Sequence, residues 1–571
     1  MTTELSIALA QINPTVGDVD GNISLIRDAR AKAAADGADL VVAGELTVCG
    51  YPPEDLVLKP AFLDRVEEKV NALAAETSDG GPAMIIGAPW REGGSKNDRE
   101  DGKLFNAVML LDQGEISTIR YKHLLPTYGV FDEDRVFDRG PVPGPISFKG
   151  VRLGVMVCED MWDTDVTECL DESGAEILIV INGSPFEVDK EDQRLNLAVA
   201  RVGESGLPLV YVNLVGGQDE LVFDGGSFVL NADRQLQVQM PSFVLGQVNT
   251  HWTKSDQGWA CTKGEIEPVG ENGEQMLASI YQAMVLGLRD YVNKNRFPGV
   301  ILGLSGGIDS GLSAAVAVDA IGADKVHCVM MPSPYTSQDS LDDAAEQAAT
   351  LGITYDTVPI LDAMKAFDGM LAPVFGDTEA DTTEENIQAR ARGLIVMAIS
   401  NKLGFMPLTT GNKSEMSVGY ATLYGDMCGG YSVLKDVYKT TVFAVSHWRN
   451  KNFVAGFLGP EKQAIPERVI TKKPSAELKP DQFDEDSLPP YDVLDDILMS
   501  LIEGESAIDE IVAKGHDPAI VRRVWHMLDR AEYKRRQAPP GVKISSRAFG
   551  RDRRYPITNG FTNLMWEIEG K

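Results

Sequence analysis

The sequence predicts an α/β protein composed of two consecutive α/β domains. Short apolar runs alternate with helical patterns along most of the 571 residues, as is typical of layered α/β folds. A polar, Gly-rich stretch without periodicity follows residue 258 and indicates a domain boundary. We therefore predict a first domain over 1–258, a linker over 259–275 and a second domain over 276–571.

The first domain is expected to combine β-strands with amphipathic helices. The apolar spacing from Ile23 to Ala33 predicts a helix over 21–37, and a similar pattern predicts one over 194–205. The predicted strands are 5–10, 40–43, 83–87, 151–157, 177–181 and 209–212, with antiparallel segments near 105–111 and 226–230.

The second domain shows a regular strand-helix alternation, which predicts a doubly wound parallel sheet. A Pro- and Asp-rich segment at 471–492 is expected to form a long functional or mobile loop. The predicted strands are 300–304, 326–331, 353–358 and 406–409, and the predicted helices are 276–293, 309–320, 337–351 and 384–403.

Composition narrows the possible function classes. Lys and Arg total 53 against 85 Asp and Glu, so the chain carries a net charge of −32 and is expected to repel nucleic acid. No apolar run is long enough to span a membrane, and the N-terminus has no secretory pattern. The six Cys and six His are scattered, with no CxxC or HExxH spacing. We expect a cytoplasmic protein without a structural zinc site or a membrane partner.

The Gly-rich turn over 304–310 is the strongest motif of the second domain. It lies between an apolar strand and a helix, where glycines and free N–H groups at the helix start can hold a phosphate. Asp309 would tolerate a phosphate only with a cation between them, so it predicts Mg²⁺. A capped strand-helix turn is the structural alternative. The predicted phosphate-binding residues are Gly303, Leu304, Ser305, Gly306, Gly307, Ile308, Asp309 and Ser310.

Other residues of the second domain are candidates for the same site. Glu415 follows a predicted strand at the edge where open α/β sheets bind ligands, and it could share the cation with Asp309. Its alternative role is that of an acid in the first turn of a helix. The segment 534–554 holds eight basic residues and one acid, so it could clamp anionic substrates or form a solvated or oligomer surface.

The motif SGGIDS is similar to the pyrophosphate loop of the N-type ATP pyrophosphatases, which split ATP into AMP and pyrophosphate. This resemblance implies that ATP is a co-substrate and that a Rossmann-like domain adenylates an acceptor. It also implies that Thr410 contacts ATP.

In the first domain, Cys158 ends an apolar strand, a position that would expose a nucleophile. A lone cysteine is usually a core residue, but Glu45 and Lys122 also follow strand ends. We expect the three side chains to line one active-site pocket. There the lysine would favour the thiolate form of the cysteine, and the glutamate would act as a general base.

The segments GELTVCGYPPEDL, KHLLPTYGVFDE and MVCEDMW resemble the signatures of the nitrilase superfamily, apart from Gly44, where that family more often has Pro. The resemblance implies an α-β-β-α sandwich that carries a Glu-Lys-Cys catalytic triad. Glu45 would be the base of this triad, Lys122 its lysine and Cys158 its nucleophile. Glu133 occupies the position of an additional acid.

Over essentially its whole length the chain resembles the glutamine-dependent NAD⁺ synthetases, through segments such as LTTGNKSEMSVGYATLYGDMCGGY and KRRQAPPGVKISSRAFGRDRR. The resemblance implies that ammonia from glutamine amidates adenylated nicotinic acid adenine dinucleotide, in a homo-oligomer. The implied glutamine-binding residues are Tyr128, Ser184 and Lys190, and the implied dinucleotide-binding residues are Asn386, Glu415 and Lys534.

Two alternatives remain open on the sequence. The first is another adenylating enzyme, either a different amidotransferase or an RNA-modifying enzyme that holds RNA on the basic segment. The second is a domain that senses adenine nucleotide and gates a separate amidase. The net charge argues against RNA as the substrate.

Overall fold

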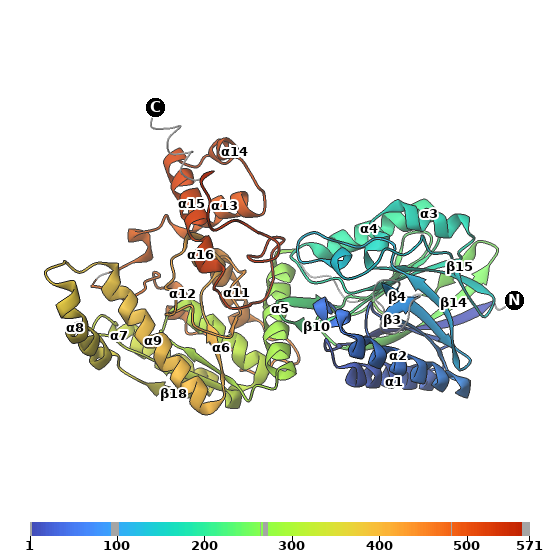
Figure 1. Cartoon of the computed structure of the whole chain (residues 1–571), viewed down its shortest axis with the longest axis horizontal. Helices are drawn as coiled ribbons and strands as arrows, with labels where there is room; N and C mark the ends of the chain where they lie inside the picture. Colours follow the sequence, from blue (N-terminus) through green and yellow to red (C-terminus); the bar gives the residue numbers. More distant parts are fainter. Residues whose placement is uncertain (1–2, 93–101, 263, 267–271, 481, 562–571) are drawn as a thin grey trace. The chain divides into compact units, whose positions relative to one another are not determined.

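The computed structural model describes residues 3–92, 102–262, 264–266, 272–480 and 482–561 (Figure 1). The chain divides into two compact units, Met1–Gly270 (unit 1) and Glu271–Lys571 (unit 2). None of the helices in these described ranges has the length and apolar character needed to cross a bilayer.

Unit 1 contains a seven-stranded mixed sheet with strand order β15-β14-β1-β2-β3-β4-β5. Strands β1, β2 and β3 run parallel, whereas β4 pairs antiparallel with β3 and β14 pairs antiparallel with β1 over eight positions. The strands are β1 (Glu4–Gln11), β2 (Leu40–Ala43), β3 (Ala83–Glu92), β4 (Lys103–Asp112), β5 (Glu115–Tyr121), β14 (Gly246–Ser255) and β15 (Gly258–Cys261).

A six-stranded sheet forms the second β-layer of unit 1, with strand order β13-β12-β9-β8-β7-β6. Its central strands β7, β8 and β9 are parallel, and a separate two-stranded ribbon pairs β10 with β11. The strands are β6 (Ile146–Phe148), β7 (Val151–Val157), β8 (Ile177–Asn182), β9 (Leu209–Asn213), β10 (Val215–Gln218), β11 (Leu221–Asp224), β12 (Phe228–Leu230) and β13 (Leu236–Gln239).

The two sheets pack face to face between two layers of helices, because their central strands bury side chains on both faces. Ile7 and Leu9 of β1 meet Val155 and Val157 of β7 in the core between the sheets. The opposite face of the seven-stranded sheet packs on α1 (Val19–Ala35) and α2 (Pro60–Glu76), and that of the six-stranded sheet on α3 (Thr164–Glu172) and α4 (Lys190–Ser205). The predicted α-β-β-α sandwich is therefore confirmed.

The predicted linker contains a strand that the sequence analysis missed. Trp259 and Cys261 of β15 are buried, while Ala260 between them is exposed, so the short run pairs with β14 as a half-buried strand. Of the Gly residues that suggested a linker, Gly258 begins this strand and Gly273 lies in the first turn of the next helix. Unit 2 begins with α5 (Asn272–Lys294), slightly earlier than predicted.

Unit 2 is built on a five-stranded, all-parallel sheet with strand order β18-β17-β16-β19-β20. On one face, Ile301 and Val329 pack against Val396 of α9 (Thr382–Leu403). The sheet also contacts α6 and α7, whereas α5 packs on α6. The strands are β16 (Val300–Gly303), β17 (Val326–Met330), β18 (Thr354–Thr357), β19 (Met406–Thr409) and β20 (Tyr431–Ser432).

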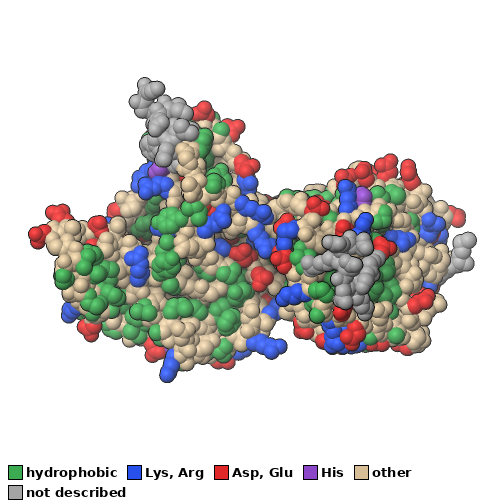
Figure 2. Space-filling model, viewed as in Figure 1, with side chains coloured by type: hydrophobic (Ala, Val, Ile, Leu, Met, Phe, Trp, Pro, Cys, Tyr) green, Lys and Arg blue, Asp and Glu red, His purple; other side chains and the backbone are tan. Residues whose placement is uncertain are grey.

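The helices of unit 2 cover the sheet and extend into a C-terminal helical cluster with its own core. Helix α8 buries none of its residues although it is rich in apolar side chains, and Figure 2 shows hydrophobic side chains over this part of unit 2. The helices are α6 (Ile308–Ile321), α7 (Gln338–Leu351), α8 (Leu361–Phe375), α9 (Thr382–Leu403), α10 (Lys413–Val418), α11 (Lys439–Lys451), α12 (Glu467–Thr471), α13 (Tyr491–Ile502), α14 (Ile508–Ala513), α15 (Pro518–Arg530) and α16 (Glu532–Arg535).

Candidate active sites

Glu45, Lys122 and Glu133 form a buried charge cluster in unit 1. Lys122 Nζ donates to Glu45 Oε1 at 2.7 Å and to Glu133 Oε1 at 2.8 Å. Burial alone would lower the pKa of Lys122, but the charges of Glu133 and Glu45 hold it well above its ordinary value. The lysine is therefore a fixed cation between two carboxyl groups.

Cys158 lies at the end of β7 and begins the 3₁₀ turn Cys158–Met161. Its φ of 47° is in the left-handed region, which L-residues adopt only where the surroundings impose it. Burial and the charge of Glu45 raise the pKa of the thiol well above its ordinary value, although Lys122 acts in the opposite direction. The charge of Lys122 thus acts in the predicted direction, towards the thiolate, but burial and Glu45 outweigh it.

Two side chains without a predicted role hold this cluster together. Asn106 donates to Glu45 Oε1 at 2.8 Å and to Glu133 Oε2 at 3.3 Å. Asp160 accepts from the backbone N–H groups of His123, Leu124 and Val157, which ties the Lys122 segment to the end of β7. The sequence offered only weak signals: Asp160 lies two residues after Cys158, and Asn106 lies within a predicted strand.

The residues implied to bind glutamine lie around the same turn. Tyr128 donates to both carboxylate oxygens of Glu159 at 3.0 Å, so it is tied to the residue after Cys158. Lys190 Nζ lies 5.0 Å from the ring centroid of Trp162, which follows the turn. Ser184 is buried after β8, beside Gly183, whose N–H donates to Glu45 Oε2 at 2.9 Å.

In unit 2 the predicted phosphate loop joins β16 to α6. Ser305 and Ser310 approach each other with hydroxyl oxygens 3.1 Å apart, and the N–H of Gly307 donates to Ser305 Oγ. Gly306 has a φ of +77°, and a Cβ placed there would lie 2.3 Å from the carbonyl oxygen of Ser340. Leu304 and Ile308 have buried side chains, so only their backbone can face a ligand.

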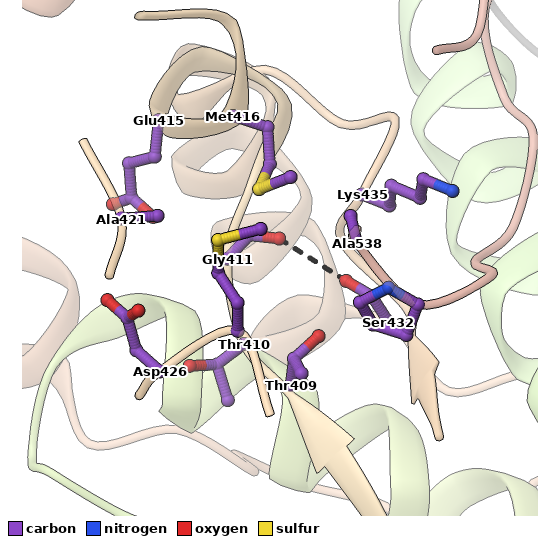
Figure 3. A pocket seen from close by; sticks show the side chains of 12 residues that line it. Thr409, Thr410, Gly411, Glu415, Met416, Ala421, Asp426, Ser432, Lys435 and Ala538 are labelled. Atoms are coloured by element: carbon purple, nitrogen blue, oxygen red, sulfur yellow. Dashed lines mark hydrogen bonds between the residues drawn. The ribbon is translucent and has the colours of Figure 1, made fainter. Parts of the chain in front are cut away.

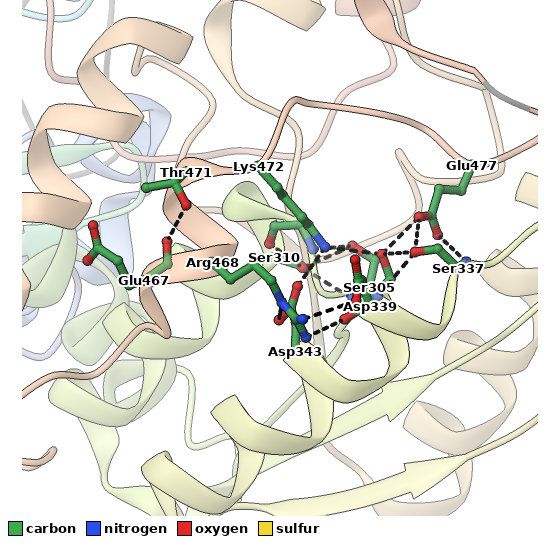
Figure 4. A network of polar contacts seen from close by, with 12 residues as sticks. Ser305, Ser310, Ser337, Asp339, Asp343, Glu467, Arg468, Thr471, Lys472 and Glu477 are labelled. Carbon is green, nitrogen blue, oxygen red and sulfur yellow. Dashed lines mark hydrogen bonds and ion pairs between the residues drawn. The ribbon is translucent and has the colours of Figure 1, made fainter.

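A polar network connects this loop region to the segment predicted as a long loop (Figure 4). Glu477 accepts from the hydroxyls of Ser337 and Ser340, while Lys472 donates to Ser340 and pairs with Asp343 at 2.9 Å. The described residues of segment 471–492 are irregular apart from the end of α12, the 3₁₀ turn Asp484–Asp486 and the start of α13 (Tyr491–Ile502). These contacts attach it to α7, which packs against Gly306 through Ser340.

Asp309 and Glu415 are brought together, as expected, but a lysine joins them. Lys439 Nζ contacts the carboxylate of Asp309 and lies 3.4 Å from Glu415 Oε1. Asn412 donates to Asp309 at 2.8 Å, and its side chain caps α10 by accepting from the N–H of Glu415. Burial and the charge of Asp309 raise the pKa of Glu415 to about 8. The sequence analysis missed Lys439, which is 130 residues from Asp309.

Asp309 and Glu415 could bind a divalent cation if a bound ligand supplied the rest of its coordination shell. The two carboxylates are of the type that Mg²⁺ prefers, and each side chain is 17% exposed. Within the described ranges no cluster of three or more His, Cys, Asp or Glu could hold a metal. Further oxygens, such as phosphates, would therefore have to come from the ligand.

A pocket opens beside Glu415 at the carboxyl ends of the parallel strands (Figure 3). Thr410 lies on its wall, and Gly411 accepts a hydrogen bond from Ser432 across it. Asn386 and Lys534 both contact the segment beside the pocket: Asn386 accepts from Thr422, and Lys534 donates to the carbonyls of Gly419 and Ala421. The lining residues are Thr409, Thr410, Gly411, Glu415, Met416, Ala421, Asp426, Met427, Ser432, Lys435, Ala538 and Pro539.

The basic segment 534–554 is not a free cationic clamp. Arg535 and Arg553 are buried and pair with Glu532, and Lys543 is buried and pairs with Asp552 at 2.9 Å. Internal partners neutralise these cations because bare charges are costly to bury. The prediction of a clamp is therefore wrong for these three residues.

Two protein families match separate parts of the chain. Residues 6–250 match the carbon-nitrogen hydrolase family, and residues 280–538 match the NAD synthase family. A glutamine-dependent NAD(+) synthetase of Rhodobacter capsulatus is 50% identical over 560 residues, which cover 98% of this chain and 99% of the relative. The chain belongs to the glutamine-dependent NAD(+) synthetases.

Two further relatives support this result. The glutamine-dependent NAD(+) synthetase of Thermotoga maritima is 40% identical over 98% of this chain and 99% of its own length. The structure of the Acinetobacter baumannii glutamine-dependent NAD+ synthetase, in complex with ADP, matches with a TM-score of 0.76 and 44% identity, over 98% and 99% of the two chains. As a glutamine-dependent NAD(+) synthetase, the chain combines a glutaminase domain with an NAD synthase domain. This decides against an RNA-modifying enzyme and against a nucleotide sensor.

Proposed function

We propose that unit 1 hydrolyses glutamine with Cys158 as nucleophile, Glu45 as general base and acid, and Lys122 as the cation of the oxyanion site. The observation that carries this proposal is the buried Glu45–Lys122–Glu133 cluster beside a cysteine with left-handed backbone. Lys122 has three N–H donors, and two are directed at Glu45 and Glu133 within the described part of the chain. The third can stabilise an oxyanion.

Glu45 accepts and returns the proton in both halves of the proposed hydrolysis. Cys158 Sγ attacks the side-chain amide carbon of glutamine as its proton passes to Glu45, because the resting thiol is neutral. Glu45 then protonates the amide nitrogen, which leaves as ammonia. Water next attacks the thioester, again giving a proton to Glu45, and the returning proton restores the thiol.

The remaining residues of this site would select glutamine. Tyr128, Ser184 and Lys190 surround the turn after Cys158, and they offer hydroxyl and ammonium groups to the amino-acid end of the substrate. Glu133 would hold Lys122 in place, since it contributes the second ion pair of that lysine.

Unit 2 is proposed to bind ATP and nicotinic acid adenine dinucleotide. The backbone of 303–310, the hydroxyls of Ser305 and Ser310, and Thr410 would hold ATP, and Asn386, Glu415 and Lys534 would contact the dinucleotide. The nicotinate carboxylate attacks the α-phosphorus and releases pyrophosphate. Ammonia then attacks the adenylated carbonyl carbon, AMP leaves, and NAD⁺ results.

Asp309 and Glu415 would hold Mg²⁺ between the protein and the ATP phosphates. The cation would neutralise charge on the leaving pyrophosphate. Lys439 pairs with both carboxylates, and we propose that it contributes a second positive charge at this point. Its contact with Asp309 places it beside the phosphate loop.

Ammonia released by unit 1 is proposed to be used directly by unit 2, since both activities belong to one chain. We also propose a cytoplasmic homo-oligomer. The described cysteines are free thiols, which agrees with a reducing compartment. The apolar side chains of Met370, Val374 and Leu394 are 63%, 76% and 64% exposed, which favours association.

The test is a product assay for NAD⁺, AMP and pyrophosphate with ATP, Mg²⁺, the deamido dinucleotide and either glutamine or ammonium. Cys158→Ala should abolish glutamine use and preserve synthesis from ammonium. Cys261→Ala is a matched control, because both cysteines lie in unit 1 and are 4% exposed. If the Cys158 variant still uses glutamine, or loses both activities, the two-site proposal is wrong.

A further inference from the structure

Arg194 and Asp224 form a buried ion pair beside the proposed glutamine site. Arg194 lies on α4 and Asp224 ends β11, and each side chain is 4% exposed. Arg194 Nη1 donates to both carboxylate oxygens of Asp224, at 2.8 Å and 2.7 Å. A pair this deeply buried is costly unless every donor and acceptor is used, so its other contacts are informative.

The remaining N–H groups of Arg194 are directed at one short segment, 182–185, which follows β8. Its Nε donates to Ser184 Oγ at 3.0 Å, and Nη2 donates to the carbonyl oxygens of Ser184 and Pro185 at 3.0 Å and 2.7 Å. All five N–H groups of the guanidinium are therefore used. The arginine fixes both the backbone and the hydroxyl of Ser184.

The same segment contacts the proposed base on its other side. The N–H of Gly183 donates to Glu45 Oε2, and the N–H of Glu45 donates to the carbonyl of Asn182. A Cβ at Gly183 would lie 3.2 Å from Glu45 Oε2, so a larger residue would crowd this approach. Glu45 Oε1 is occupied by Lys122 and Asn106, which leaves Oε2 to depend on Gly183.

Helix α4 carries both this arginine and Lys190, another residue proposed to bind glutamine. Lys190 is the first residue of α4, and Arg194 lies four residues later, one turn further along the same face. Asn213 completes the arrangement, because its side chain accepts from the N–H of Ser184 and donates to the Ser184 carbonyl.

We propose that Arg194 and Asp224 are positioning residues of the glutaminase, which hold segment 182–185 so that Gly183 binds Glu45 while Ser184 and Lys190 face glutamine. This inference rests on the proposed roles of Glu45, Ser184 and Lys190. Neither Arg194 nor Asp224 touches a reacting atom in this proposal. They couple the position of the base to the position of the substrate-binding residues.

Lysine cannot replace the arginine in this role. A guanidinium reaches three carbonyl or hydroxyl oxygens and one carboxylate at once, because its five N–H groups form a fixed planar fork. An ammonium has three donors on one atom, so Arg194→Lys keeps the charge but releases part of segment 182–185. Asp224→Asn keeps the size of the side chain and weakens the pair from the other side.

The experiment compares Arg194→Lys and Asp224→Asn with a matched control, Arg30→Lys. Arg30 lies in unit 1 and makes the same kind of contacts, two hydrogen bonds to Asp79 and one to the carbonyl of Pro82. Steady-state kinetics are measured with glutamine and with ammonium, and thermal unfolding is measured for each variant. The rate of Cys158 alkylation by iodoacetamide is measured against pH.

In both site variants we expect the KM for glutamine to rise and kcat to fall, with kcat/KM lower by about 10- to 100-fold. Ammonium-dependent synthesis should not change, and the pH profile of Cys158 alkylation should shift because Gly183 no longer fixes Glu45. Arg30→Lys should lose stability without these changes. If Arg194→Lys does not fold, Asp224→Asn carries the test.

The proposal is overturned if both site variants lose stability as Arg30→Lys does while their glutamine kinetics and alkylation profiles match those of the unaltered chain. Failure of the proposed function gives a different result, since Cys158→Ala would then retain glutamine use.

Discussion

Lys122 Nζ lies 2.7 Å from Glu45 Oε1, and neither side chain has any exposed surface. A buried cation and carboxylate at this distance depend on each other, because removing one leaves the other charged and without water. The pair therefore serves both the stability of unit 1 and its proposed chemistry, and substitutions at this point should affect both.

Replacing Lys122 by Met should destabilise the protein by about 3–5 kcal/mol, because two buried carboxyl groups lose their cation. Glutamine-dependent synthesis should be lost and ammonium-dependent synthesis retained at temperatures where the variant is folded. Chemical denaturation and the two assays measure these effects. Lys149→Met is the control, since Lys149 pairs with Asp39 at the surface, where such a pair contributes about 1 kcal/mol or less. Equal losses in the two variants would contradict the prediction.

Glu133 should give the stability of the protein a defined pH dependence. Burial raises the pKa of Glu133 to about 6, against the opposing charge of Lys122. Between the ordinary carboxyl pKa and this value, the folded chain keeps the proton that the unfolded chain releases. The contribution of Glu133 to stability must therefore fall as pH rises through this window.

The Glu133→Gln variant lacks this pH-dependent contribution of Glu133. The slope of its free energy of unfolding against pH should therefore be more positive than that of the unaltered protein across the same window. Denaturant titrations at a series of pH values measure both slopes. Identical slopes in the two proteins would show that Glu133 does not titrate as described.

Gly306→Ala should impair the synthetase reaction alone. The new Cβ would meet the Ser340 carbonyl at 2.3 Å in a left-handed backbone, so the phosphate loop must move. We expect the KM for ATP in the ammonium assay to rise by about tenfold or more. Gly352→Ala is the control, because Gly352 also has positive φ but no atom lies within 4 Å of its added Cβ. A comparable rise in the control would assign the effect to backbone strain elsewhere.

Lys439→Met should leave Asp309 and Glu415 facing each other without their shared cation. Ammonium-dependent synthesis is expected to fall by about 100-fold or more, as for the loss of a preorganised charge at a reacting group. Glutamine hydrolysis should persist. The control is Lys451→Met, at the exposed end of the same helix. Synthesis at the normal rate in Lys439→Met would remove this residue from the site.

Much of the fold could be predicted because the central sheets of both units are covered on both faces. Strands in such sheets are buried on both sides and are therefore recognisable as apolar runs in the sequence. The strands around Val155 and Ile301 are continuous apolar runs for this reason. Strands with weaker patterns were missed in part or entirely. Only the end of β5, before Lys122, was expected, because this strand has only exposed or half-buried residues at the edge of its sheet. Strand β14 was missed, because it carries polar residues on its outer face.

The site could be predicted where a motif brings its residues together in sequence, as in 304–310, or where a strand end displays them, as for Cys158. Residues that act through tertiary contacts gave no such signal. Lys439 contacts Asp309 only because α11 packs against α6. The role proposed for Arg194 likewise depends on its tertiary partners, such as Asp224. The raised pKa of the Cys158 thiol also could not be predicted, since it depends on burial that the sequence does not display.

The three residues of the proposed glutaminase triad come from different β-layers. Glu45 and Lys122 follow strands of the seven-stranded sheet, whereas Cys158 ends a strand of the six-stranded sheet. During synthesis the ribosome releases the base and the lysine before the thiol, and the thiol meets them only when the second sheet closes onto the first. A chain in which the two sheets of unit 1 have not yet packed together therefore cannot release ammonia, so this reactivity begins only when unit 1 has folded.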